Sequence, residues 1–213
     1  MRRFLSSAAI LAVLTATATT GGIALAAPDS DGVAPMVSSS LVVNEVATRG
    51  PSGQLDEFIE VLNVSNQYID LANFEVRVYS PSNVLLAAID FLPGMVLEPR
   101  GNAGSVVVLT GTQFSGTVDV GALVQPISLT GQGIPDTGGV GVFTQAGVRV
   151  DGVAFSVPVT ATREGTATRP QTIVPPGIDP LLAVSSARDV ISTDTDNNQR
   201  DFSLHVRTPG ALN

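Results

Sequence analysis

The sequence of 213 residues contains no cysteine, no lysine and a single histidine, His205. Without cysteine the chain forms no disulfide, offers no thiolate nucleophile and lacks the sulfur ligands of the common zinc sites. A lone histidine without a Gly-x-Ser-x-Gly motif is a poor basis for a catalytic triad, and no phosphate loop or His-Glu-x-x-His motif is present. These absences disfavour the common hydrolase classes and leave stability to a hydrophobic core.

The N-terminus carries the pattern of a targeting segment. Arg2 and Arg3 precede an apolar stretch from Phe4 to Leu14, and Ala24-Leu25-Ala26 matches an A-x-A cleavage site. This pattern predicts a signal peptide over residues 1–26. The small and apolar stretch continues to residue 27, so an uncleaved membrane anchor is the alternative. We expect a protein secreted to the extracellular space or the cell envelope, with no stable membrane span after cleavage.

The charge balance is strongly acidic. Eleven arginines face 19 acidic residues, for a formal charge of −8, and losing Arg2 and Arg3 with the signal peptide takes it to −10. The remaining arginines are scattered along the chain, so they form no basic patch. We therefore expect no nucleic-acid partner, because an acidic chain repels a phosphate backbone.

Residues 27–40 are rich in Pro, Ser, Asp and Gly without periodicity, which predicts a mobile leader. Short apolar runs follow from residue 41 to residue 213, separated by Gly, Pro, Asn and Asp. In one of them, Phe74–Tyr79, apolar and polar residues alternate as in a half-buried strand. Many short strands at this spacing predict an all-β, antiparallel sandwich or barrel, and residues 156–180 read as a long surface loop. The expected strands are 41–47, 57–63, 68–71, 74–79, 84–90, 95–97, 105–110, 118–124, 126–129, 140–144, 148–155, 181–185 and 202–206.

Oxygen-bearing side chains gather near the C-terminus. Asp194, Asp196 and Asn198 alternate, with Asp201 close behind, and such a loop can converge on Ca²⁺. It is not an EF-hand, because Gln199 stands where the loop needs Gly. The alternative is a turn held by Asx bonds to its own backbone. Calcium is the one cofactor that the sequence suggests.

Glu57 and Glu60 lie in one expected strand and point to opposite faces, so they form no close carboxylate pair. One of them must therefore sit among apolar neighbours. Such a buried carboxylate needs hydrogen bonds or an arginine. A structural carboxylate is favoured over a glycosidase-like acid–base pair, for which no second placed carboxylate is evident.

Eight segments stand in a specific order along the chain: Val42–Val46, Glu57–Asn63, Ile69–Phe74, Gly131–Ile134, Gly141–Phe143, Val150–Phe155, Asp201-Phe202 and Thr208–Asn213. Their order from residue 41 to residue 213 resembles the lamin tail domain family in its secreted bacterial form. Leu62 stands where that family often has Tyr, and Asn73-Phe74 where Gly-Trp is common. The resemblance implies an immunoglobulin-like antiparallel β-sandwich, no catalytic residues and a role as an accessory or interaction module.

The sequence thus predicts a non-enzymatic binding or scaffolding module of the cell envelope or extracellular space. Its partner would be a protein or another envelope component, contacted through the loops 156–180 and 189–201 because loops carry function on such scaffolds. Two alternatives stay open: a calcium-stabilised structural module, and a secreted hydrolase that works with carboxylates.

Overall fold

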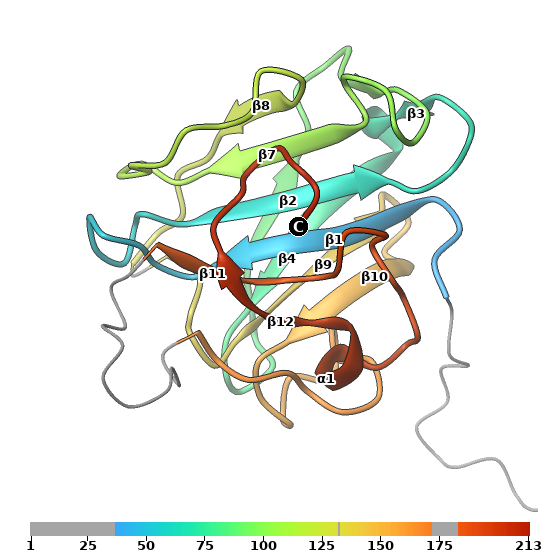
Figure 1. Cartoon of the computed structure of the whole chain (residues 1–213). Helices are drawn as coiled ribbons and strands as arrows, with labels where there is room; N and C mark the ends of the chain where they lie inside the picture. The colour runs from blue at the N-terminus through green and yellow to red at the C-terminus, as the bar shows by residue number, and fades with distance from the viewer. Residues whose placement is uncertain (1–36, 132, 172–182) are drawn as a thin grey trace, which may run out of the picture. The chain divides into compact units, whose positions relative to one another are not determined.

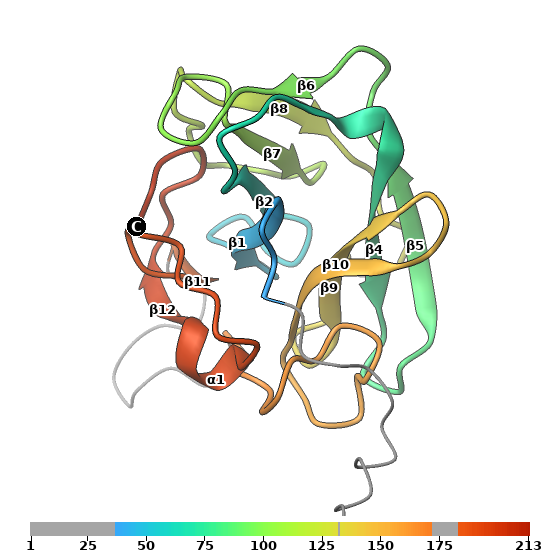
Figure 2. The same cartoon turned by 90° about the vertical axis from the view of Figure 1, so that its right-hand side faces the viewer.

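The computed structural model describes residues 37–131, 133–171 and 183–213. They form a β-sandwich of two main sheets, with a third sheet of two short strands. Figure 1 looks onto the first sheet, and Figure 2 shows the two layers nearly edge-on. The all-β sandwich predicted from the sequence is confirmed.

The first sheet has six strands and the second has four. All pairs are antiparallel except β7 with β8, which run parallel. The first sheet follows the order β12 (Ser203–Val206), β11 (Val184–Ala187), β1 (Leu41–Ala47), β2 (Phe58–Asn63), β7 (Val106–Thr110) and β8 (Leu123–Pro126). The second follows the order β10 (Arg149–Ala154), β9 (Gly139–Thr144), β4 (Phe74–Tyr79) and β5 (Leu85–Asp90). The short strands β3 (Ile69–Asp70) and β6 (Val96–Leu97) pair, with the 3-10 turn η1 at Leu71–Asn73 and the one-turn helix α1 at Asn198–Asp201.

The main core lies between the two sheets and consists largely of β-branched side chains. Val43, Ile59 and Val107 face it from the first sheet, and Val76 and Val142 from the second. Their alternation along each strand follows from the two-residue period of a β-strand. Because a branched side chain packs well on a pleated surface, these residues favour the sandwich.

A second apolar cluster lies on the outer face of the first sheet, around Phe58, Leu62 and Val108. The C-terminal tail, residues 207–213, crosses this face, as the red trace of Figure 1 shows. The segment 114–122 packs there too, and Asp119 N–H donates to the Pro209 carbonyl at 2.9 Å. The first sheet is therefore buried on both sides where this tail crosses it.

Most predicted strands are found, and β1 and β4 match residue for residue. The predictions 118–124 and 126–129 are wrong in extent, because a single strand, β8, spans Leu123–Pro126. β11 begins at Val184 and extends two residues beyond the predicted 181–185, of which 181–182 lie outside the described residues. Residues 156–171 contain no strand, as predicted, yet Val159 and Thr162 are fully buried. That part of the predicted surface loop packs onto the second sheet.

The predicted signal peptide, residues 1–26, lies outside the described residues, as does most of the predicted leader. The end of that leader is attached: Ser38 N–H donates to Asp194 Oδ2 at 2.7 Å. In the part of the chain that the structure describes, no helix has the length and apolar character needed to cross a membrane.

Candidate functional site

Four carboxylates surround one arginine at the edge where the two sheets meet. We name Arg188 with Asp151, Glu164, Asp194 and Asp201 the Arg188 cluster. The Arg188 side chain is completely buried, and none of the four acidic side chains is more than 5% exposed. Burying this many charges is costly unless each one finds a partner.

The guanidinium of Arg188 distributes its donors over the cluster. One terminal nitrogen lies 2.9 and 3.2 Å from the two oxygens of Asp151, and the other lies 3.2 Å from Asp201 and 3.5 Å from Asp194. Nε donates to the Val43 carbonyl at 3.0 Å, and the guanidinium lies 4.6 Å from the ring centre of Phe202. A planar fork with five donors can make these contacts together, and a lysine ammonium cannot.

The local fold explains why these side chains meet here. β11 ends at Ala187, which pairs with Glu45 of β1. The backbone of Val43 therefore has no residue of β11 opposite it, and side chains supply its hydrogen-bond partners. Asp151 Oδ2 accepts the Val43 N–H at 2.5 Å, and Arg188 supplies the donor to the Val43 carbonyl. Both β1 and β10 carry an irregular register at this point, as is common where a strand is re-aimed. The cluster thus ties the first sheet to the second.

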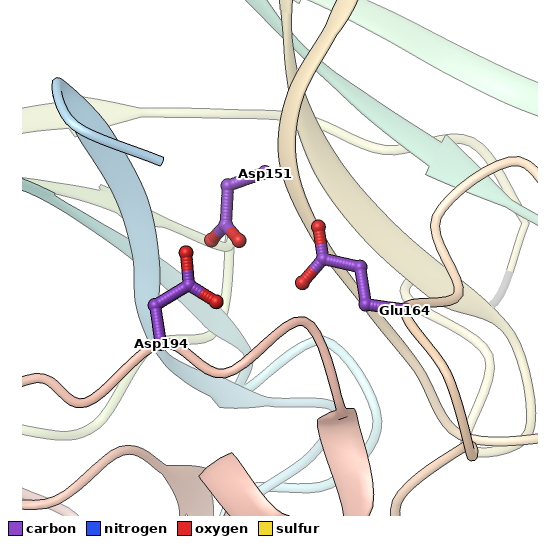
Figure 3. A group of neighbouring side chains, drawn as sticks. All are labelled: Asp151, Glu164 and Asp194. Carbon is purple, nitrogen blue, oxygen red and sulfur yellow. The ribbon is translucent and has the colours of Figure 1, made fainter. Parts of the chain in front are cut away.

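Figure 3 shows Asp151, Glu164 and Asp194 pointing toward one another from three segments of the chain. One oxygen from each lies within 4.8 Å of the others, a spacing that could hold a metal ion. However, the Arg188 guanidinium already contacts all three, at 2.9 Å, 3.9 Å and 3.5 Å. The Arg188 guanidinium therefore occupies the place of a cation among these three carboxylates.

Glu164 is the exception within the cluster, because its Oε2 accepts no hydrogen bond from any described residue. Burial, together with the charge of Asp151, raises the pKa of Glu164 to about 10. Burial also raises the pKa of Asp151, against the opposing charge of Arg188. A protonated Glu164 can donate to Asp151, which resolves its missing bond.

The predicted calcium ligands Asp194, Asp196, Asn198 and Asp201 lie in the turn before α1 and in α1 itself. Asp194 and Asp201 both face Arg188. Asn198 instead turns into the sandwich, where its oxygen accepts the Ala154 and Glu164 N–H groups. The Asx bond of the alternative interpretation is present, since Asp194 Oδ1 accepts the Asp196 N–H at 3.2 Å. Calcium binding stays a prediction, and the geometry links Asp194 to residues that the sequence did not suggest.

A second group of buried acids lies under the C-terminal tail. Glu45 and Glu60 are direct cross-strand partners on β1 and β2, and both are fully buried. Glu45 accepts hydrogen bonds from the N–H and hydroxyl of Thr208, and Glu60 accepts the Gly210 N–H at 2.7 Å. Burial and the charge of Glu45 raise the pKa of Glu60 to about 8. We name Glu45 and Glu60 the tail pair.

The structural role predicted for a buried glutamate in this strand is confirmed. Glu60 bonds to Gly210 and to the Asn44 amide, and Glu57 accepts the Ile134 N–H at 2.5 Å. Burial raises the pKa of Glu57 to about 7. The close carboxylate partner of Glu60 is Glu45 from the neighbouring strand, which no spacing within one strand could reveal.

The single histidine lies on the edge strand β12. Its Nε2 is 2.8 Å from Ser203 Oγ, and Ser203 is exposed. No carboxylate among the described residues bonds to the other ring nitrogen, so the pair lacks the third member that orients a catalytic histidine.

Comparison with protein-family models and with curated proteins finds no match for this chain. The lamin tail resemblance therefore rests on the sequence motifs.

Proposed function

We propose that the chain is a secreted, non-enzymatic binding or scaffolding module with an immunoglobulin-like, lamin-tail-type sandwich. Its place of action would be the extracellular space or the cell envelope. The non-enzymatic part is supported by how its buried acids are used. Asp151, Glu45 and Glu60 each accept a backbone N–H from a distant segment, which is a structural use of a carboxylate.

The observation that carries the binding role is the edge strand β5. It is the last strand of its sheet, and no described strand pairs with its outer edge. Leu85 and Leu86 are each 46% exposed and Val84 is 58% exposed. Natural edge strands are usually protected by charges, proline or a covering loop, because an open edge pairs with other chains. From Leu85 to Ile89 this strand carries no charge.

We infer that an extended segment of an envelope protein adds to β5 by main-chain hydrogen bonds, as in other cases of strand addition. A basic segment fits best, because the chain has a formal charge of −8 and would attract it. We favour the edge of β5 over the loop 156–180 as the contact region, because Val159, Thr162 and Gln171 of that loop are fully buried.

The test is binding of arginine-rich extended peptides, measured by fluorescence anisotropy. Leu86→Asp should weaken binding at least tenfold, because it places a charge on the apolar edge. Val157→Asp is the matched control, since Val157 is 66% exposed but lies off the edge. Equal binding by both variants would remove β5 as the site. Ester, glycoside or peptide hydrolysis that one Asp or Glu substitution abolishes would overturn the non-enzymatic proposal.

A further inference from the structure

Thr48 and Gln171 form a buried polar group at the end of β1, apart from the Arg188 cluster and the tail pair, and the partly exposed Asp136 lies beside it. Thr48 is 1% exposed and Gln171 is fully buried. Gln171 Oε1 accepts the Thr48 N–H at 2.9 Å, and Gln171 Nε2 donates to the Arg49 carbonyl at 2.9 Å. These two bonds fix which end of the amide is oxygen, since the partners are a donor and an acceptor.

The Thr48 hydroxyl has two neighbours, a base and an acyl group. It donates to Asp136 Oδ1 at 2.7 Å, and it lies 3.4 Å from Gln171 Oε1. That oxygen is bonded to the amide carbon at about 1.2 Å, so the hydroxyl lies beside the amide group, on its oxygen side. Arg49 forms an ion pair with Asp136 and fixes its position.

These contacts match the parts required for acyl transfer. A hydroxyl beside a carboxylate base is an activated nucleophile. A backbone N–H on the carbonyl oxygen is placed to stabilise the charge that develops there, and in serine hydrolases the N–H of the nucleophilic residue itself contributes in this way. The burial of Thr48 and Gln171 holds the hydroxyl and the amide together and limits the access of water to them, which favours attack by the hydroxyl over hydrolysis.

We propose that Thr48 and Gln171 join in an intramolecular ester bond. Thr48 Oγ1 forms a bond to Gln171 Cδ while its proton passes to Asp136. The bond from Cδ to Nε2 then breaks, and the nitrogen takes the proton from Asp136 and leaves as ammonia. No oxidant or co-reactant is consumed, and the product is an ester with one ammonia lost.

The crosslink would connect the end of β1 to a segment 123 residues later. Closing so long a loop restricts the unfolded chain strongly. A chain with neither cysteine nor lysine has no disulfide and no lysine–asparagine bond to serve this purpose. The ester gives a secreted scaffold a covalent tie from the residue types that it does possess.

The experiment is mass spectrometry of the folded, full-length protein after trypsin digestion. Cleavage after arginine gives one peptide that ends at Arg49 and another that spans Glu164–Arg188. We expect these two peptides to appear joined, with the mass of one ammonia missing. Hydroxylamine, which cleaves esters, should separate them.

Three variants separate the chemistry from the fold. Thr48→Val should abolish the linked peptide, whereas Thr48→Ser keeps a hydroxyl and should retain it. Asp136→Asn should slow or abolish the linkage because the base is lost. Thr110→Val is the matched control, since Thr110 is another buried threonine, 8% exposed, that lies on β7 outside both linked peptides.

Circular dichroism establishes which variants are folded, and only those are compared. Separate peptides of full mass from the folded wild-type protein would overturn the proposal. Gln171 recovered as glutamate without a linked peptide would overturn it too, because water would then have been the nucleophile. A linked peptide that persists in folded Thr48→Val would assign the bond to another residue and refute Thr48.

Discussion

The Arg188 cluster and the tail pair both bury carboxylates in the β-sandwich, but they stabilise them in different ways. The Arg188 cluster places a guanidinium within 4 Å of four acids. In the tail pair, Glu45 and Glu60 lie side by side, and they accept hydrogen bonds from amides and hydroxyls. The burial of the Arg188 cluster depends on a permanent cation. The burial of the tail pair depends on hydrogen-bond donors from the C-terminal tail and on a bound proton. The two should therefore respond differently to mutation and to pH.

The largest effect is expected when the cation is removed. Arg188→Met leaves the carboxylates of Asp151 and Asp201 buried without their partner, a change that typically costs about 3–5 kcal/mol. The free energy of unfolding in urea measures this loss. Arg77→Met is the control, because Arg77 pairs with Glu75 near the surface and such pairs contribute about 0–1 kcal/mol. A smaller loss for Arg188→Met than for Arg77→Met would contradict the account.

The tail pair should make stability fall as pH rises. The pKa of Glu60 is about 8 in the folded protein against 4.5 for a free glutamate, so the folded state binds the proton more tightly. The resulting stabilisation is complete below pH 4.5 and is lost as the pH rises toward 8 and beyond. Glu57 and Glu164, with raised pKa values, add to the same trend.

Glu60→Gln isolates the contribution of the tail pair. The amide can still accept the Gly210 N–H, but it carries no charge to oppose Glu45. The variant should be more stable than the wild type by about 1–3 kcal/mol at pH 8.5 and nearly equal to it at pH 5, since one pKa unit corresponds to about 1.4 kcal/mol. Thermal melts at the two pH values test this, and an equal difference at both would refute it.

The packing of the tail can be weakened by a substitution in the tail that leaves Glu45 and Glu60 unchanged. Gly210 has φ +91°, and a Cβ there would lie 2.9 Å from Ala122 Cβ and from the Asp119 nitrogen. Gly94 has φ +82° with open space around it, so Gly94→Ala measures the backbone strain alone, about 1 kcal/mol. We expect Gly210→Ala to cost roughly 1 kcal/mol more because it adds a clash in a packed site. If both variants lose the same free energy of unfolding in urea, the tail moves to accommodate the added methyl group without cost.

Calcium should have the smallest effect. With Arg188 among the carboxylates, Ca²⁺ should leave the melting temperature of the wild type unchanged, because only a ligand that binds the folded state raises it. In Arg188→Met, if the variant folds, Ca²⁺ should restore part of the lost stability. A wild-type melt that rises with Ca²⁺ and falls back with chelator would instead support the calcium-stabilised module.

Local patterns were enough to predict the strands whose residues alternate. Phe74–Tyr79 is an example, because the two-residue period of a strand assigns each of its side chains to one face of the sheet. The extent of β8 was missed because two apolar residues just before it have another use: Val118 and Ala122 pack under the tail on the outer face of the first sheet. Propensity does not distinguish these two uses of an apolar run.

The sites were harder to predict, because their members come from distant segments. Asp151 and Arg188 are 37 residues apart and Glu45 and Thr208 are 163 apart, distances over which sequence spacing carries no information. One signal was present: Asp151 follows Val150 and precedes Gly152-Val153-Ala154-Phe155 in an expected strand that is mostly apolar. An acid in such a strand requires a buried donor, but a backbone N–H or any of several arginines could supply it.

The attachment of the tail has a consequence for how the protein is made. Glu45 and Glu60 leave the ribosome 163 and 150 residues before Thr208 and Gly210, the partners that satisfy them. Chains grow from the N-terminus, so the first sheet cannot close its outer face before the tail has been synthesised. We expect Glu45 and Glu60 to lack these partners in every nascent polypeptide that ends before residue 208.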